Sequence, residues 1–577
     1  MLEVVRAVIW LWTPEAEASI TWSSAINNQD SSILPTISSP LLPASLFSSI
    51  GMESPLIESS LTAGAEDDLE HAVLLPRSTS GAPAADEREG RQRRHLGLLS
   101  TTFLITNRMI GTAIFSTPSA IAASVGSAGA ALALWVVGLL LAYCGMFIWI
   151  ELGSLMPRSG GEKVYLEAAY PRPAMLVTTV FAVHVIFLGF TGIGGVVVAE
   201  NILLALNGSA NDWVKRALAI AVLAAIATIH IRFSAMGVKI MNVLASVKII
   251  ILCLIILSGL RALRGDLPQI PDPASSLKDP FGGSSSSVSD YTNALFKILA
   301  TYQGWSNAAY VLDEVQNPRK VLKIAGLVGV GSVGLLYILT NISYFIVATP
   351  EEISKTGVTV VALLIGKVFG ETMLWLTAIL AALSSFGNLM TASFTMSRVV
   401  REFAKEGILP CSRFFVATTP SGSPSAAFLL VFLSSTLMIL FIPFGEVYNF
   451  LLDVGQYAIA IINILVVLGL FAIRRREHSA RQRMRTFRAW TPVASLFFLS
   501  QIFLLVTPFV PSAVDVGKAL PSWLYALVAL LVFLGAGVYW FVEWEVLPRR
   551  GGFVWTARES VSADGEDVVV WDKVKLN

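Results

Sequence analysis

The stretch NRMIGTAIFSTP, residues 107–118, decides the fold, because it interrupts the first long apolar segment of the chain. It places glycine at 111, threonine at 112 and proline at 118, residue types that weaken the interior of a helix. Backbone that leaves helical geometry at membrane depth is tolerated only where it lines a cavity or is buried in protein. The stretch therefore predicts a transmembrane helix broken near Gly111. A glycine-containing packing face between helices is the alternative for this stretch taken alone.

The composition around this stretch is that of a membrane protein. Of the 577 residues, 54% are hydrophobic and 14% are charged, whereas a soluble domain carries charge on about a quarter of its residues. A spanning helix needs about 20 apolar residues, and about twelve such segments follow one another. A soluble protein is excluded, and we expect an all-α polytopic membrane protein. The expected spans lie near residues 100–125, 128–155, 174–205, 214–232, 237–260, 291–312, 321–347, 360–396, 425–442, 447–473, 490–510 and 521–542.

The flanks and loops predict the domain organisation and the orientation. Residues 1–97 are rich in serine, proline and acidic residues, which is typical of a disordered tail. Residues 98–545 would form the membrane domain, and 546–577 a C-terminal tail. Lysine and arginine are concentrated in loops on the side of the two termini, which the positive-inside rule places in the cytosol. Asn207 begins an Asn-Gly-Ser sequon in an expected exoplasmic loop and is a candidate glycosylation site.

A second interrupted segment, LATYQGWSN at residues 299–307, lies in the sixth expected span. Paired broken helices in corresponding halves of a chain mark the binding site of secondary transporters. The second half of the first span would direct free N–H groups at an anion, naturally a substrate carboxylate. The first half of the sixth would expose carbonyl oxygens that suit an ammonium group, with Ser306 and Asn307 nearby. An ordinary kinked helix is the alternative for this segment.

Ionisable residues within spans are candidates for function by default. Lys248 lies inside the fifth span, where a change of protonation could accompany transport. A permanently charged structural bridge is its alternative role. Asp453, Glu200 and His184 are further candidates for proton handling, or else solvated or hydrogen-bonded groups near the span ends.

Ordered motifs resemble a known family. The stretch 107–118 is similar to the Gly-Ser-Gly-Ile-Phe signature of permeases of the amino acid–polyamine–organocation superfamily, and further motifs of these permeases occur in order at 151–165, 304–319 and 385–410. Within the superfamily, the chain most resembles L-type amino acid transporters of the fungal high-affinity methionine class. The resemblance implies two inverted five-helix repeats plus two extra helices, with helices 1 and 6 broken.

The resemblance also implies a substrate site. Backbone amides of the first break would bind the carboxylate, and the sixth span would surround the amino group. Ala113 replaces the family's usual second glycine and should narrow the floor of the site. Ala300 stands where animal relatives usually carry a gating aromatic residue. The implied substrate-binding residues are Gly111, Thr112, Ala113, Thr301, Tyr302, Gly304, Ser306, Asn307 and Asn388.

Ion coupling and gating follow from the same resemblance. Lys248 matches the lysine that replaces a sodium ion in sodium-independent relatives, and it would hold spans one, five and eight together. Glu151 and Glu314 would act as inner-gate residues that pair with loop arginines or lysines such as Arg398. A disulfide-linked heavy subunit is not expected, because the loop at 207–213 contains no cysteine.

The functional hypothesis is a secondary active permease of the plasma membrane. It would import neutral L-amino acids, methionine first, by alternating access, with protons as the driving ion. An amino-acid exchanger, or a receptor that signals without net flux, is the alternative. An enzyme is not expected, since no metal-ligand cluster or nucleophile–base pair occurs across the spans. Nor is a cofactor or a nucleic-acid partner.

Overall fold

The computed structural model describes residues 94–575, except for 190, 207–210, 266, 357–359, 410, 420–421, 445, 477–486, 510–520 and 562–566. These residues belong to one compact unit, Ala84–Asn577. The sequon at Asn207 and almost all of the expected N-terminal tail lie outside the described residues.

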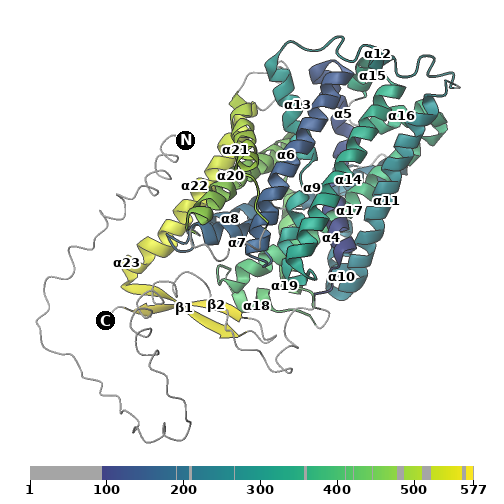
Figure 1. Cartoon of the computed structure of the whole chain (residues 1–577). Coiled ribbons are helices and arrows are strands. Elements are labelled where there is room, and N and C mark those ends of the chain that lie inside the picture. Colours follow the sequence, from purple (N-terminus) through teal and green to yellow (C-terminus); the bar gives the residue numbers. More distant parts are fainter. Residues whose placement is uncertain are drawn as a thin grey trace, which may run out of the picture. The chain divides into compact units, whose positions relative to one another are not determined.

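Long apolar helices lie side by side and form the body of the protein (Figure 1). Among the described residues, nine helices are long and apolar enough to cross a membrane, or ten if one bent pair counts as a span. Each expected span contains at least one helix, so the prediction of a polytopic helical fold is confirmed. The elements up to residue 314 are α4 (Leu98–Met109), α5 (Ala113–Val125), α6 (Ala128–Leu155), α7 (Glu162–Ala169), α8 (Leu176–Leu188), α9 (Gly192–Ala205), α10 (Asp212–Arg232), α11 (Ser234–Ala262), α12 (Ser275–Lys278), α13 (Val288–Thr301) and the 3₁₀ helix η3 (Trp305–Glu314).

The second part of the chain continues in the same way and ends in a β-hairpin. Its elements are α14 (Pro318–Val347), α15 (Pro350–Lys355), α16 (Val360–Phe369), η4 (Glu371–Met373), α17 (Leu374–Lys405), α18 (Ser412–Val416), α19 (Ser425–Phe441), α20 (Glu446–Arg476), α21 (Thr491–Val506), η5 (Thr507–Phe509), α22 (Ser522–Phe541), the π-helical turn η7 (Val542–Val546), α23 (Leu547–Gly551), β1 (Phe553–Val561) and β2 (Asp567–Lys575).

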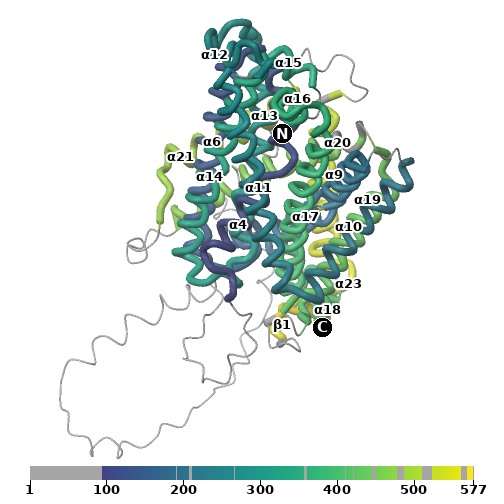
Figure 2. The backbone as a smooth tube through the Cα atoms, turned by 90° about the vertical axis from the view of Figure 1, so that its right-hand side faces the viewer, coloured from purple at the N-terminus to yellow at the C-terminus, as the bar shows by residue number. Residues whose placement is uncertain are grey.

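The first and sixth spans are both broken, as the sequence predicts. α4 and α5 are bent by 42° at the break that follows Met109. The sixth span consists of α13 and η3, with Gly304 between them at a φ of 116°. The first half-helix α4 packs against α11, α14, α17 and η3 (Figure 2). The two breaks therefore lie inside the bundle, surrounded by protein.

The eighth span differs from its expected range of 360–396. The structure divides this range into the short helix α16 and the long helix α17, which continues to Lys405. Gly370 connects them at a φ of 88°, a conformation that glycine adopts at little cost. The sequence merges the two helices because apolar residues flank this glycine on both sides.

The C-terminal segment forms a hairpin, which an all-helical prediction does not include. β1 pairs antiparallel with β2, from Phe553 opposite Lys575 to Val561 opposite Asp567. The indole N–H of Trp571 donates to the carbonyl of Glu406, just beyond α17, at 3.0 Å. The hairpin is thus attached to the end of the eighth span.

This attachment depends on Gly407. Its φ is +74°, and a Cβ there would overlap the Val569 carbonyl and lie 2.8 Å from Cδ1 of Trp571. We expect Gly407→Ala to loosen the hairpin and to raise hydrogen exchange across residues 553–575. Gly422→Ala is the matched control, because Gly422 has a φ of +76° but no neighbour within 4 Å. Equal exchange in the two variants would contradict the attachment.

Candidate functional site

The break in the first span leaves a row of backbone carbonyls without helical partners. Lys248 satisfies two of them: its ammonium donates to the carbonyl of Asn107 at 2.8 Å and to that of Ile110 at 2.6 Å. Lys248 is buried, with 1% of its surface exposed. It therefore joins α11 to the break through charge-assisted hydrogen bonds.

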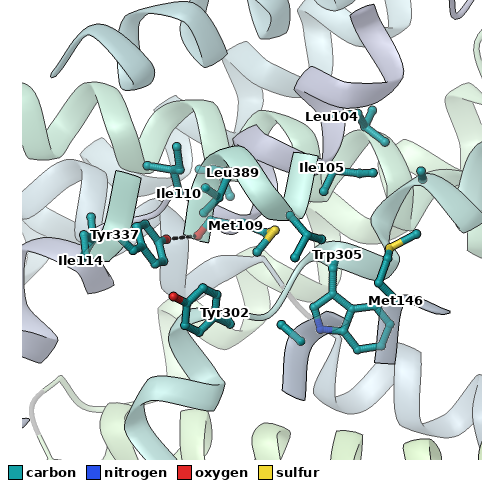
Figure 3. Close-up of a cluster of buried hydrophobic side chains, with 14 of the residues drawn as sticks. Leu104, Ile105, Met109, Ile110, Ile114, Met146, Tyr302, Trp305, Tyr337 and Leu389 are labelled. Atoms are coloured by element: carbon teal, nitrogen blue, oxygen red, sulfur yellow. Dashed lines mark hydrogen bonds between the residues drawn. The ribbon is translucent and has the colours of Figure 1, made fainter. Parts of the chain in front are cut away.

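Three more carbonyls of the row accept hydrogen bonds from other helices. The donors come from α14 and α17, and Figure 3 shows one of them, the Tyr337 hydroxyl directed at Met109. Every carbonyl from residue 107 to residue 111 thus has a side-chain donor, as non-helical backbone in a dry environment requires. The three pairs are Asn388 Nδ2 with the Arg108 carbonyl (2.7 Å), the Tyr337 hydroxyl with the Met109 carbonyl (2.9 Å) and the Ser384 hydroxyl with the Gly111 carbonyl (3.1 Å).

The amide side of the break remains open. Gly111, Thr112 and Ala113 are all half-buried, and α5 begins directly after Thr112 without a side-chain cap. The first N–H groups of a helix have no acceptor within it. Together with the positive end of the helix dipole, they form a site for an anion.

The break in the sixth span lies against the break in the first. Gly304 contacts the end of α4 so closely that a Cβ would lie 2.9 Å from the carbonyl carbon of Arg108. The Thr301 hydroxyl donates to its own helix at Lys297 (2.8 Å) and to Thr117 of α5 (3.3 Å). These contacts bring both interrupted segments together, as the resemblance implies.

The remaining side chains of this region are mostly engaged with protein. The Tyr302 hydroxyl donates to the Trp135 carbonyl at 3.2 Å, and its ring packs against that of Tyr337 with centroids 5.3 Å apart. Asn307 is buried and accepts from Thr395 at 3.1 Å, whereas Ser306 is half-buried. Asn388 also accepts from the Arg108 guanidinium at 2.8 Å, which makes it a two-way bridge between α17 and α4.

A small cavity adjoins the sixth break. Ala300 lines it, and the side chains of α20 and α21 close the opposite wall. The lining contains amide and apolar groups, and none of its residues is charged. Its members are Phe296, Ala300, Gln303, Gln456, Ala460, Gln501 and Leu504.

The other proposed ion-coupling residues lie elsewhere. Glu200 is 47% exposed and faces Lys215 at 3.8 Å, near the end of α9. Asp453 is half-buried in α20. His184 is buried in α8, where its ring stacks on Phe533 with centroids 5.9 Å apart. The structure brings Lys248 to the break, whereas Glu200 faces Lys215 and His184 packs against α22.

Two buried ion pairs lie on the side of the expected inner gate. Arg398 donates to Glu314 at 2.8 Å, as the sequence analysis proposes, and this pair joins α17 to η3. Glu151 does not pair with Arg398. Its partner is Arg474 of α20 (2.8 Å), and the Ala489 N–H donates to the same carboxylate at 2.7 Å. Arg474 lies in a cluster of basic residues, which gives no sign of which one is buried.

Several residues of the site give little or no signal in the sequence. Tyr337 and Ser384 each carry one hydroxyl group within an apolar segment, and such residues usually only pack against neighbouring helices. Arg108 lies in the stretch 107–118, and its charge within a span, three residues before Gly111, is a signal that the sequence does contain. The carbonyl partners of Lys248 could not be foreseen, because they follow from the path of the broken backbone.

Comparison with known proteins agrees with these features. A profile of the amino acid permease family matches residues 96–534. The chain is 31% identical to the high-affinity methionine permease of Saccharomyces cerevisiae over 476 residues, 82% of this chain and 83% of that protein. It is 30% identical to the low-affinity methionine permease of the same organism over 496 residues, 84% and 88% of the two chains. The b(0,+)-type amino acid transporter 1 of Homo sapiens is 26% identical over 471 residues, 78% and 89% of the two chains.

We expect Lys248→Met to destabilise the purified protein. The substitution leaves the carbonyls of Asn107 and Ile110 unpaired, at a cost of about 1–3 kcal/mol for each buried group. Thermal unfolding in detergent should show a lower midpoint. Lys239→Met on the same helix is the control, because Lys239 is exposed. Equal midpoints in the two variants would show that Lys248 does not support the break.

Proposed function

Because the chain belongs to the amino acid permease family, we propose that it imports neutral L-amino acids, methionine first, by alternating access coupled to protons. It is a multi-pass membrane transporter and not an enzyme. We further propose that it acts in the plasma membrane with both termini in the cytosol. No disulfide-linked heavy subunit is required in this proposal.

One observation carries the proposal: the two broken spans meet at their breaks, where the first contributes the start of a helix and the sixth the end of one. The uncapped start of α5 offers N–H groups to a carboxylate. The end of α13 offers carbonyl oxygens to an ammonium group, and Gly304 lets this end approach α4 closely. An amino acid carries both charges on one carbon atom and can bridge the two breaks.

The cavity beside the sixth break supports a neutral side chain. A charged substrate side chain would lose hydration there without gaining an ion pair, because the lining residues are uncharged. Ala300 presents only a methyl group to this small cavity. An unbranched, polarizable thioether such as that of methionine adapts to irregular space of this kind.

The ion pairs on the expected inner side support alternating access. Glu314 with Arg398, and Glu151 with Arg474, connect helices that would separate if the site opened to the cytosol. Opening would place both partners of each pair in water, which offsets the lost attraction.

Uptake by the full-length protein in liposomes tests this function. Labelled methionine should accumulate when an inward proton gradient is applied, and neutral amino acids should compete better than arginine or glutamate. Exchange without net accumulation would indicate an exchanger. Binding without any flux would indicate a receptor.

We expect Gly111→Val to abolish methionine uptake while the protein still reaches the membrane. A Cβ at Gly111 would already lie 3.2 Å from Nδ2 of Asn388, and valine adds two methyl groups beside the amides of α5. Uptake per molecule at the cell surface is the measurement. Gly535→Val is the control, since Gly535 lies in α22 with no neighbour within 4 Å of a Cβ. Normal uptake by Gly111→Val would refute the assigned carboxylate site.

A further inference from the structure

A buried carboxyl group lies next to the sixth span but outside the proposed substrate site. Glu162 begins α7, in the connection between the second and third spans, and is 5% exposed. The preceding Gly161 donates its N–H to the Ala309 carbonyl of η3 at 3.2 Å. A Cβ at Gly161 would lie 2.7 Å from the Tyr310 ring. This connection is therefore in tight contact with the second half of the broken sixth span.

The Glu162 carboxyl is only partly hydrogen-bonded. The Tyr310 hydroxyl donates to Oε1 at 3.0 Å. The second oxygen, Oε2, is buried without a hydrogen bond, and so is the indole N–H of Trp149, which faces the carboxyl from α6. The adjacent Lys163 does not help, because its ammonium pairs with Glu167 and Glu406, each at 2.9 Å. A buried carboxyl without a cationic partner favours its protonated form.

Hydroxyl groups connect this carboxyl to the breaks. The Tyr310 hydroxyl also interacts with the hydroxyl of Ser306, which lies two residues after Gly304. The guanidinium of Arg108, at the end of α4, acts electrostatically on the same tyrosine. The order Ser306, Tyr310, Glu162 thus forms a short polar path from the site to the start of α7.

We propose that Glu162 is the proton-binding site of the transport cycle, loaded from the substrate site through Ser306 and Tyr310. The inference rests on the proposed function, which supplies the proton gradient. In the loading step, the Tyr310 O–H bond breaks as the Glu162 O–H bond forms. Tyr310 regains a proton from Ser306, which takes one from a hydronium ion that has entered the site, so that one proton moves, the hydronium becomes water and each hydroxyl is restored.

Burial gives the direction of the pH dependence. It raises the pKa of Glu162 from 4.5 to about 7, while the hydrogen bond from Tyr310 partly opposes this rise. When η3 and α7 separate, the carboxyl becomes hydrated, its pKa falls and the proton leaves to the cytosol. The closed contact is therefore favoured at low pH, and this contribution is lost as the pH rises through about 7.

The titratable groups around Glu162 are consistent with its raised pKa. Tyr165 on its own helix interacts with the carboxyl. From α17, Glu402 lies against Gly160, and Asp313 at the end of η3 accepts from the Ser159 N–H. The other helices packed on α7 present polar groups to its far end, where Thr178 of α8 donates to Glu167 and the Leu465 carbonyl of α20 accepts from Tyr170.

The test uses the full-length protein in liposomes with labelled methionine. The pH is about 5.5 outside and about 7.5 inside, so that the two values lie on either side of the range in which the Glu162 carboxyl titrates. Wild type should accumulate methionine, up to about 100-fold for one proton per substrate, since tenfold corresponds to one pH unit. Glu162→Gln should still exchange internal for external methionine but should lose the stimulation by the gradient. Tyr310→Phe should slow gradient-driven uptake, because it interrupts the path.

Glu167→Gln is the matched control, since Glu167 lies on the same helix, 29% exposed, and outside the path; it should keep the stimulation. Glu162→Asp guards against misfolding of the glutamine variant: it should stay coupled with a lower pH midpoint, because the ordinary pKa of aspartate is lower. Gradient-driven accumulation by Glu162→Gln at the wild-type level would overturn the inference and leave methionine import intact. Wild-type exchange without a gradient response would refute proton coupling together with the inference. No methionine flux at all in wild type would refute the proposed function itself.

Discussion

The broken first span exists because five consecutive carbonyls find donors outside their own helix. An unpaired carbonyl in a membrane costs several kcal/mol, so a break of this kind is sustained only by such partners. Lys248 supplies two of the bonds, and α14 and α17 supply the others. With its carbonyls occupied, the break leaves only the amides of α5 available to a ligand. The polarity of the site thus follows from the way in which the backbone is satisfied.

The expected inner side is held by ion pairs that each join two different elements. Arg398 and Glu314 connect α17 to η3, Arg474 and Glu151 connect α20 to α6, and Lys163 connects α7 to Glu406 beyond α17. Buried pairs of this kind contribute little net stability, because both partners give up hydration. Their advantage is that the contact can be broken reversibly, because separating the two elements returns both charged groups to water together. Such pairs are compatible with the opening and closing of this side that the proposed alternating access requires.

The sequence predicted the fold better than the site. Glycine and proline in apolar segments revealed both breaks, and the charge of Lys248 marked it as a candidate for function, with a structural bridge as the alternative. The side chains that pair with buried groups were harder to predict. Arg474 is one basic residue among several, and Tyr337 resembles any aromatic residue in a helix. The hairpin was missed because the C-terminal segment contains no apolar run long enough to cross a membrane, and it was therefore expected to be a tail. The division of the eighth span at Gly370 was also missed, because the positive φ of 88° that separates α16 from α17 is visible only in the structure.

The carbonyl row also has a consequence for biogenesis. Its acceptors lie at residues 107–111, whereas its donors lie between 138 and 280 positions later in the chain. When the first span is synthesised, none of these donors exists, and an unbroken helix is the only way to pair the carbonyls in lipid. The break can therefore be completed only after the fifth, seventh and eighth spans have assembled around the first. The proposed substrate site is thus complete only late in assembly, because its donors on α17 are synthesised after those on α11 and α14.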